Sequence, residues 1–319
     1  MAMSRTRSIA FTKMNGLGND FVVIDARRER LALAAEGARA LAARENASTK
    51  GCDQLLILHP PRNAGQRKGD VFMQIFNADG GEVEACGNGA RAVAAYLARQ
   101  GTPEPIIETL GGTLQAQMPA NQVPVNNVNF PGIIMPTPRR GWKDIPLAEK
   151  VADTSQVTLH PDLPPAFMVN VGNPHAVIFV DGGTADLAAQ YGLELEKNRL
   201  LPEGANINFA ACTGDTIIEL DTWERGAGLT QACGTGACAT AVAAFHLGKI
   251  GNHNNEFRIE PPCARDQEFK DNSDRAGIHQ DNLLEILVDY DGHSLAQQGP
   301  VAFEFDGEFE AEFEAGAVS

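Results

Sequence analysis

The stretch ACGNGA at residues 85–90 returns as ACGTGA at residues 232–237, and this repeat decides how the chain is expected to fold. The second residue of each copy is a cysteine, Cys86 or Cys233, and the two cysteines are 147 residues apart. Each copy continues into an alanine-rich run that stops at a glycine. Because alanine is the best helix former and glycine commonly ends helices, each hexamer predicts the start of a helix that is buried nearly all round.

Two further features precede each hexamer in the same order. A Gly-Asn pair followed by a strand-like apolar run begins at Gly18 and again at Gly172. Nine positions before each cysteine stands a polar residue, Asn77 or Glu224, which follows a β-like run and begins a glycine-containing loop. Three features that recur at nearly the same offset indicate an internal duplication. The predicted fold class is therefore α/β (α+β), built from two similar halves.

Other stretches bound these halves. The break between them is expected within residues 121–146, which are rich in Pro, Asn and Gly. The C-terminal run VAFEFDGEFEAEFEA alternates Phe with acidic residues, which is the period of a half-buried strand. Its phenylalanines are expected to face a core and its acids to face water. The polar segment 264–282 is interpreted as a surface loop of unknown role.

Composition excludes several classes of protein. The 319 residues hold 26 Lys+Arg against 41 Asp+Glu, a net charge of −15, which argues against nucleic acid or an anionic membrane as the partner. Six cysteines are too few for a disulfide scaffold. No apolar run approaches the roughly 18 residues of a membrane helix, and the N-terminus lacks the apolar core of a signal peptide. We expect a cytoplasmic protein with reduced thiols.

A cysteine at a helix start has a specific chemistry. The unpaired N–H groups and the helix dipole stabilise a thiolate, so the pKa of Cys86 and of Cys233 is expected to fall below the ordinary value of about 8.5. The same N–H groups can hold a carboxylate. If two such copies face each other across a cleft, one thiolate can remove a proton from a carbon while the other thiol returns one on the opposite face. That inverts a stereocentre such as an amino acid α-carbon, without a strict need for metal or pyridoxal phosphate.

These residues resemble those of the diaminopimelate epimerases, a family of cofactor-independent two-cysteine epimerases of the lysine and peptidoglycan pathway. The similarity extends over most of the chain. It is carried by six matching stretches: MNGLGNDFVVID at 14–25, GCDQLL at 51–56, FNADGGEVEACGNGAR at 76–91, GNPHAV at 172–177, ANINF at 205–209 and ERGAGLTQACGTGACA at 224–239.

The resemblance implies an acid–base pair of Cys86 and Cys233, with the direction of reaction deciding which is the base. It implies main-chain groups after each cysteine that hold the reacting carboxylate, and a guanidinium that grips a second carboxylate of the substrate. It also implies side chains near the thiols that influence their protonation, His175 and Glu224. The implied substrate contacts are Asn19, Gln54, Asn77, Gly87, Asn88, Asn173, Asn206, Glu224, Arg225, Gly234 and Thr235.

The implied fold has two pseudo-symmetric halves, each a curled mixed sheet around a central helix. The C-terminal strand is expected to return to the first half. We thus predict an N-terminal half of 1–130 plus 299–319 that carries Cys86, a C-terminal half of 131–298 that carries Cys233, and an active site in the cleft between them. The implied partner is diaminopimelate, with no cofactor, metal, nucleic acid or membrane; a homodimer is left open. The linker and the loop after Pro261 depart from the usual family pattern.

Several alternatives compete with these interpretations. Zinc binding by Cys233 and Cys238 is disfavoured, because a spacing of five places them on different helix faces. GNGAR lacks the G-K-[ST] of a phosphate loop. His175 can be a core histidine, Arg225 a surface ion-pair partner, and the two Gly-Asn asparagines mere turn residues. The other cysteines are read as buried small apolar residues: Cys52, Cys212, Cys238 and Cys263.

Competing functions remain as well. A related racemase acting on proline, hydroxyproline or histidine shares the thiol chemistry, but such substrates lack a second carboxylate for Arg225. A thiol redox or metal-binding protein predicts bound metal or a working disulfide, and no exchange of an α-proton.

Overall fold

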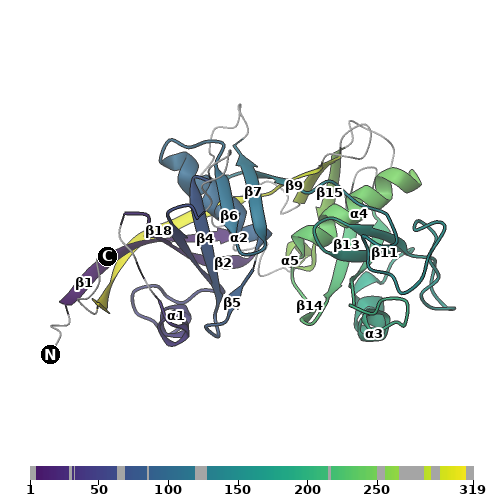
Figure 1. Cartoon of the computed structure of the whole chain (residues 1–319), viewed down its shortest axis with the longest axis horizontal. Coiled ribbons are helices and arrows are strands. Elements are labelled where there is room, and N and C mark those ends of the chain that lie inside the picture. The colour runs from purple at the N-terminus through teal and green to yellow at the C-terminus, as the bar shows by residue number, and fades with distance from the viewer. Residues whose placement is uncertain are drawn as a thin grey trace. The chain divides into compact units, whose positions relative to one another are not determined.

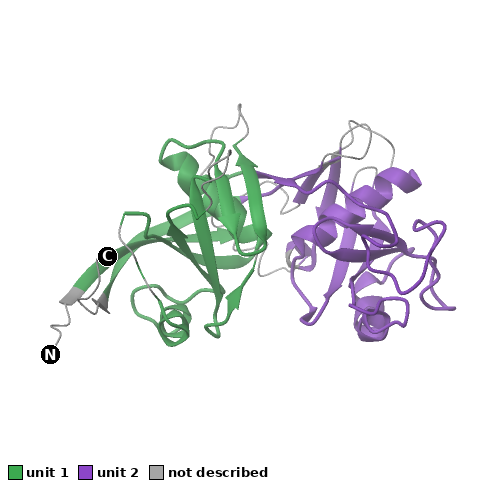
Figure 2. Cartoon of the chain, in the orientation of Figure 1, with its two compact units in different colours: residues 1–131, 301–319 green, residues 132–300 purple. Residues whose placement is uncertain are grey.

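The computed structural model describes residues 5–28, 31, 33–62, 69–84, 86–118, 128–214, 217–249, 256–265, 284–288 and 295–313 (Figure 1). The chain forms two compact units (Figure 2). Unit 1 comprises Met1–Pro131 and Val301–Ser319, and unit 2 comprises Gly132–Pro300. No helix among the described residues has both the length and the apolar character needed to cross a membrane.

The described residues of unit 1 form one sheet and two helices. Its strands pair in the order β18-β1-β2-β3-β4-β6-β7, with β5 on β4 and β8 on β18. The pairs β2–β3 and β4–β6 are parallel and the others antiparallel. The elements are β1 Arg5–Gly16, β2 Asn19–Asp25, α1 Ala35–Ala42, β3 Gln54–His59, β4 Val71–Asn77, β5 Glu82–Val83, α2 Gly87–Arg99, β6 Ile106–Thr109, β7 Gly112–Gln117, β8 Val128–Asn129 and β18 Val301–Phe313.

Unit 2 repeats this arrangement. Its strands pair in the order β10-β11-β12-β13-β15-β16-β17-β9, with β14 on β13, and the parallel pairs are β11–β12 and β13–β15. The elements are β9 Gly132–Met135, β10 Phe167–Asn170, β11 Pro174–Phe179, α3 Thr184–Glu196, β12 Asn206–Cys212, β13 Ile217–Glu224, β14 Gly228–Leu229, α4 Gly234–Leu247, β15 Glu256–Glu260, α5 Pro262–Arg265, β16 Leu284–Val288 and β17 Leu295–Gln298.

The duplication extends to the register of individual residues. In unit 1, Phe21 on β2 is paired with Gln54 on β3; in unit 2, His175 on β11 is paired with Asn206 on β12. Strands β1 to β7 thus correspond in order to β10 to β16. The parallel pairs β2–β3 and β4–β6 of unit 1 correspond to β11–β12 and β13–β15 of unit 2. This confirms the predicted fold class of two similar halves, each with a mixed sheet.

A central helix packs inside each sheet. Helix α2 contacts β1, β2, β3, β7 and β18, while α4 contacts all of the strands from β10 to β17 except β14. Both helices are buried over most of their length, as expected for runs of alanine. Helix α4 ends at Gly248, whose positive φ of 59° is the left-handed conformation that favours glycine. Contacts on several sides explain why neither run needs a polar face.

The C-terminal strand behaves as its alternation predicts. Strand β18 pairs antiparallel with β1 in unit 1. Phe309 is buried and packs near Phe11, whereas Glu308 and Glu310 on either side are exposed. The side chain of Phe313 lies outside the described residues, as do most of the expected loop at 264–282 and residues 119–127 of the linker.

The interpretation of the minor cysteines needs one correction. Cys52 and Cys238 are buried, as predicted. Cys212 is exposed, because it is the last residue of β12, where the strand leaves the core. The side chain of Cys263 lies outside the described residues.

Candidate active site

Cys86 is the N-cap residue of α2. Its backbone is extended, with φ −147° and ψ 115°, and its Sγ accepts a hydrogen bond from the Gly89 N–H at 3.2 Å. Ser, Thr, Asp or Asn usually takes this role, so a thiol here is the exception. The arrangement points the sulfur toward the unpaired N–H groups of the first helical turn.

Cys233 is the N-cap residue of α4 in the same way. Its φ is −117° and its ψ 105°, and its Sγ accepts from the Gly236 N–H at 3.3 Å. The Thr235 hydroxyl lies 3.6 Å from the same sulfur. The first residue of the helix, Gly234, leaves the main chain uncovered by a Cβ.

The expected fall in the pKa of the thiol is wrong for Cys233. Burial and, to a smaller extent, the charge of the nearby Glu224 carboxylate raise its pKa to about 12. Hydrogen bonds from Thr235 and Gly236 act in the opposite direction but do not prevail. A dry site next to an anion therefore outweighs the helix N-terminus. Cys233 carries its proton at neutral pH in the ligand-free chain.

In unit 1 the predicted amide side chains form two hydrogen-bonded pairs. Gln54 at the start of β3 donates from Nε2 to Oδ1 of Asn77 at the end of β4, at 2.9 Å. Asn88 donates from Nδ2 to Oδ1 of Asn19 at 2.6 Å. The fully buried Arg91, which the sequence reasoning missed, donates from Nη2 to Asn88 Oδ1 at 2.6 Å.

In unit 2 the corresponding polar group centres on His175, which is fully buried. Its Nε2 lies 2.9 Å from Asn173 Oδ1 and 3.3 Å from Asn206 Nδ2, and its Nδ1 lies 3.1 Å from Asn208 Nδ2. Burial and, to a smaller extent, the charge of Arg225 lower the pKa of His175 to about 3. His175 is therefore neutral at physiological pH. Its expected influence on a thiol stays a prediction.

Two charged residues follow each other at the end of β13. Glu224 accepts a hydrogen bond from the Thr230 hydroxyl at 2.6 Å, which holds its carboxylate beside the thiol of Cys233. The Arg225 N–H donates to Asn206 Oδ1 at 2.8 Å, while its exposed guanidinium donates from Nη1 to the Glu203 carbonyl at 3.0 Å. Among the described residues, no carboxylate forms an ion pair with Arg225. Its guanidinium can therefore still receive an anion.

A charged network that sequence reasoning missed supports the Gly-Asn turn of unit 1. Asp20, next to Asn19, binds Lys13 at 3.2 Å and also Arg44, which in turn binds Asp53 at 2.5 Å. Burial raises the pKa of Asp20, but the hydrogen bond from Arg44 and the charge of Lys13 lower it more. The carboxylate thus stays ionised and fixes the turn. The GND and GCD motifs gave no sign that they meet.

Another missed contact lies beneath the start of α4. The amide of Gln297 on β17 is fully buried against Gly234: a Cβ added there would lie 2.5 Å from its Nε2. Neither polar atom of this amide has a hydrogen-bond partner among the described residues. Gly234 is therefore required for packing as well as for an open main chain.

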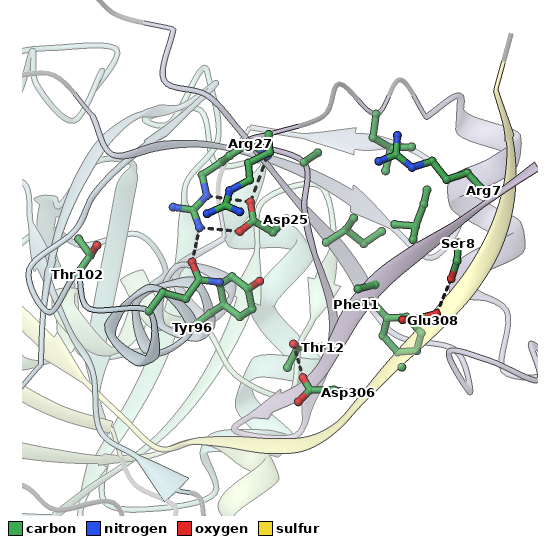
Figure 3. Close-up of a pocket in the computed structure, with 18 residues that line it drawn as sticks. Arg7, Ser8, Phe11, Thr12, Asp25, Arg27, Tyr96, Thr102, Asp306 and Glu308 are labelled. Carbon is green, nitrogen blue, oxygen red and sulfur yellow. Dashed lines mark hydrogen bonds and ion pairs between the residues drawn. The ribbon is translucent and has the colours of Figure 1, made fainter. Parts of the chain in front are cut away.

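A hollow of about 1270 Å³ in unit 1 lies elsewhere (Figure 3). It is lined by parts of β1, β2 and β18 and by the end of α2, and it includes none of the predicted site residues. Arg27 turns back to Asp25, with N–O distances of 2.8 and 2.6 Å, and Thr12 donates to Asp306 at 2.6 Å. Arg27 and Asp25 are thus engaged with each other, as are Thr12 and Asp306.

The chain shares this duplicated fold with a solved structure. That structure, a predicted epimerase from Pseudomonas aeruginosa, matches with a TM-score of 0.60 over 94% of this chain and 99% of its own, at 16% sequence identity. The two chains therefore share a fold, and in this chain a cysteine caps the central helix of each half.

Closer relatives define the family. The family model for diaminopimelate epimerase matches residues 11–129 and 167–265. The diaminopimelate epimerase of Erythrobacter litoralis is 45% identical over 303 residues, which covers 95% of this chain and 97% of the relative. That of Rhodopseudomonas palustris is 37% identical over 327 residues, 99% and 100% of the two chains. The chain belongs to the diaminopimelate epimerase family.

Proposed function

We propose that the chain is an isomerase that interconverts LL- and meso-diaminopimelate, a step in the biosynthesis of lysine and of peptidoglycan precursors. The observation that carries the proposal is the duplicated helix start. In a chain of this family, each half caps its central helix with a cysteine, and each cysteine is accompanied by amide side chains at the neighbouring strand ends.

The proposed reaction is a two-base proton transfer at the α-carbon. A thiolate on one face removes the α-proton, and a thiol on the opposite face delivers one, so that the configuration inverts. Cys86 and Cys233 are the pair, and the proposal requires that they flank one carbon. Because Cys233 retains its proton up to high pH in the ligand-free chain, it begins as the acid. Cys86 then begins as the base, and the roles reverse for the opposite direction.

The carbanion-like transition state needs stabilisation at the carboxylate. The N–H groups at Gly87–Asn88 and Gly234–Thr235 lie in the first turns of α2 and α4 and are proposed to hold this carboxylate. Each helix start adds a partial positive charge. A dry site strengthens these interactions, since fewer water dipoles screen them.

The far end of diaminopimelate carries a second amino acid group. We assign its carboxylate to the exposed guanidinium of Arg225, which can bind two oxygens at once. Glu224 can accept from an ammonium group, and the amides supply both donors and acceptors. These amides are Asn19, Gln54, Asn77, Asn173 and Asn206.

A racemase of proline, hydroxyproline or histidine is the competing assignment. It leaves Arg225 without a carboxylate, both from the substrate and from the described residues around it. We also propose that the protein acts in the cytoplasm as a homodimer and needs no cofactor. The mass of the purified protein in solution tests the dimer.

The deciding experiment follows the α-proton of LL-diaminopimelate in D₂O by NMR, with chiral analysis of the product. Wild type should incorporate one deuterium as meso product forms. Cys86→Ala and Cys233→Ala should each lose epimerisation by about 10³-fold. Folded, fully reduced wild type that exchanges no α-proton would exclude diaminopimelate as the substrate. Exchange with proline but not diaminopimelate would favour the competing assignment.

A further inference from the structure

Two asparagines hold equivalent positions in the two halves. Asn19 and Asn173 each follow a glycine with positive φ, Gly18 at 78° and Gly172 at 119°. In both cases the side-chain oxygen accepts a hydrogen bond from inside the protein, at 2.6 Å from Asn88 and 2.9 Å from His175. An amide whose oxygen is engaged in this way turns its NH₂ group outward, where it can donate to a ligand.

In unit 2 this orientation traces back to Asn208. The amide nitrogen of Asn208 donates to the Ala176 carbonyl at 3.0 Å, and its oxygen accepts from the Thr222 hydroxyl at 3.0 Å. A flipped amide would place two oxygens together at Ala176, so the orientation is fixed. The second N–H of Asn208 then faces Nδ1 of His175 at 3.1 Å, closer than the Asn206 carbonyl at 3.4 Å, so Nδ1 is the acceptor. The ring proton is left on Nε2, which donates to Asn173.

One neighbour opposes this tautomer only weakly. Asn206 keeps its oxygen on the Arg225 N–H, so its nitrogen lies toward His175 Nε2, at 3.3 Å. The opposite tautomer would gain this longer contact. It would also set Nδ1–H against the Asn208 NH₂ group at 3.1 Å and lose the donation to Asn173 at 2.9 Å. The two shorter contacts therefore decide the position of the proton.

In unit 1 a guanidinium fixes the same orientation. Arg91 can only donate, and its Nη2 donates to Asn88 Oδ1 at 2.6 Å. Asn88 must then present its nitrogen to Asn19, whose oxygen accepts it. Both Arg91 and Asn88 are buried, which strengthens these hydrogen bonds and makes a reversed amide costly.

The two halves use different positions of the fold to fix the orientation of the asparagine amide. In unit 2 the residues that fix the asparagine lie on strands, and by register they correspond to buried apolar residues of unit 1. In unit 1 the residues that fix the asparagine lie on helix α2, and they correspond to residues of unit 2 that carry no amide or guanidinium group. The pairs, unit 1 first, are Phe21 and His175, Leu56 and Asn208, Ile75 and Thr222, Asn88 and Thr235, and Arg91 and Cys238.

A buried polar group costs stability unless its hydrogen bonds are made. Unit 1 fills the strand positions with apolar Phe21, Leu56 and Ile75, and unit 2 fills the helix positions with the smaller Thr235 and Cys238. Packing alone therefore does not require either polar set. What the two sets have in common is their outcome, an asparagine with its oxygen turned inward.

We propose that Arg91–Asn88 in unit 1 and Thr222–Asn208–His175 in unit 2 are positioning relays, which make Asn19 and Asn173 present NH₂ groups to an acceptor oxygen of the ligand. This inference rests on the proposed function for the identity of the ligand, whose carboxylates supply such oxygens. In this proposal the side chains of the relay residues do not touch the ligand; only the main-chain N–H of Asn88 does. They act by fixing the direction of a hydrogen bond.

The proton position is tested without any substrate. Protein labelled with ¹⁵N-histidine reports by NMR which ring nitrogen of His175 bears the proton, and His175→Gln identifies the signal. Wild type should show Nε2–H with an unprotonated Nδ1. Asn208→Leu introduces the residue that unit 1 has at the equivalent position, Leu56, and in this variant the preference for Nε2–H should be lost. An Nδ1–H tautomer in wild type, or an unchanged tautomer in Asn208→Leu, would overturn the relay.

Kinetics with LL-diaminopimelate then tests its role. Asn208→Leu should raise KM about tenfold, the equivalent of one hydrogen bond to a charged ligand, with kcat changed less than about threefold. Asn198→Leu is the matched control, because this amide of the same unit bonds only to Leu159 and Leu200 backbone among the described residues, at 2.8 and 2.9 Å. It should leave KM unchanged. Equal losses in both variants would mean a merely structural role.

Two milder variants keep the test decisive if Asn208→Leu does not fold. Thr222→Val keeps the shape of the side chain but removes the first donor, and it should raise KM about threefold. Arg91→Lys in unit 1 keeps a donor and should retain more affinity than Arg91→Met. Wild type without epimerase activity would refute the proposed function, whereas the tautomer measurement would still decide the relay.

Discussion

The Glu224 carboxylate and the Cys233 thiol interact directly in unit 2. Burial is the main reason that the pKa of Cys233 reaches about 12, and the charge of Glu224 and its hydrogen bond to the thiol add to it. The carboxylate is held in turn by the Thr230 hydroxyl at 2.6 Å. A thiol so strongly protonated suits a proton donor, and it resists alkylation until it loses its proton.

Replacing Glu224 should therefore lower this pKa. In Glu224→Gln the negative charge is gone while burial and the Gly236 N–H remain, so the thiolate forms at lower pH. The measurement is the pH dependence of alkylation of Cys233 in a Cys86→Ala background. Glu194→Gln, which removes an exposed carboxylate of α3, should leave the profile unchanged. An unaltered profile in Glu224→Gln would show that burial acts alone.

The third residue of each central helix offers a matched pair of substitutions. A Cβ at Gly236 would lie 2.6 Å from Asn208 Oδ1 and 2.8 Å from Thr222 Oγ1, whereas one at Gly89 meets only the flexible end of Leu56 at 3.1 Å and Cys86 Sγ at 3.4 Å. Gly236→Ala should thus cost about 1–3 kcal/mol in the free energy of unfolding, and Gly89→Ala clearly less. Denaturant titration of both variants measures this. A larger loss in Gly89→Ala would contradict the packing described.

Stability toward acid should depend on His175. Its pKa is about 3 in the folded chain against an ordinary 6.5, so between these values the unfolded chain binds a proton that the folded chain does not. The contribution is complete above pH 6.5 and is lost as the pH falls toward 3, by about 1.4 kcal/mol per pH unit. His175→Gln should flatten the loss of stability between pH 6.5 and 4.5. Asn198→Leu, which removes no titratable group from the same unit, should keep the wild-type slope.

Arg225 should decide between substrates with one and two carboxylates. Arg225→Lys keeps the charge but loses the planar pair of donors, so KM for diaminopimelate should rise about tenfold while kcat changes less. Steady-state kinetics measures both. Arg199→Lys, another exposed arginine of unit 2, is the control. An unchanged KM in Arg225→Lys would remove this residue from the carboxylate site.

Two thiols that flank one carbon should also oxidise together. Mild oxidant should remove activity and two free thiols at once, and a reductant should restore both. Cys212 is exposed and will react independently, so the count is made in a Cys212→Ser background. An oxidised, inactive enzyme that retains both Cys86 and Cys233 as free thiols would contradict the proposed two-base arrangement.

The fold class was predictable because short sequence patterns identify its helices and strands. The repeated cysteine hexamer marks two helix starts, and the alanine runs and alternating apolar residues mark buried helices and strands. Cys212 shows the limit of such patterns. Its residue type favours burial, but its place at the last position of a strand exposes it, and that place depends on where the strand ends.

The candidate site was only partly predictable. Residues in recognisable motifs, such as Asn19 and Glu224, could be named because their neighbours in the sequence identify them. The pKa of Cys233 could not, since burial and the approach of Glu224 arise only in the folded unit. Asn208 was missed even though it lies two residues after Asn206 and hence on the same face of β12. Its importance depends on His175, a residue of another strand.

The exchanged relays have a consequence for how such a chain can change. The two halves derive from one ancestral unit, and a unit that carried both relays would be redundant at its asparagine. One copy can then lose one relay through substitutions while the other copy loses the opposite relay. The amide of the asparagine keeps its orientation throughout, because each copy always retains one relay. What is inherited in the two halves is the direction of a hydrogen bond, and the side chains that enforce it are interchangeable parts.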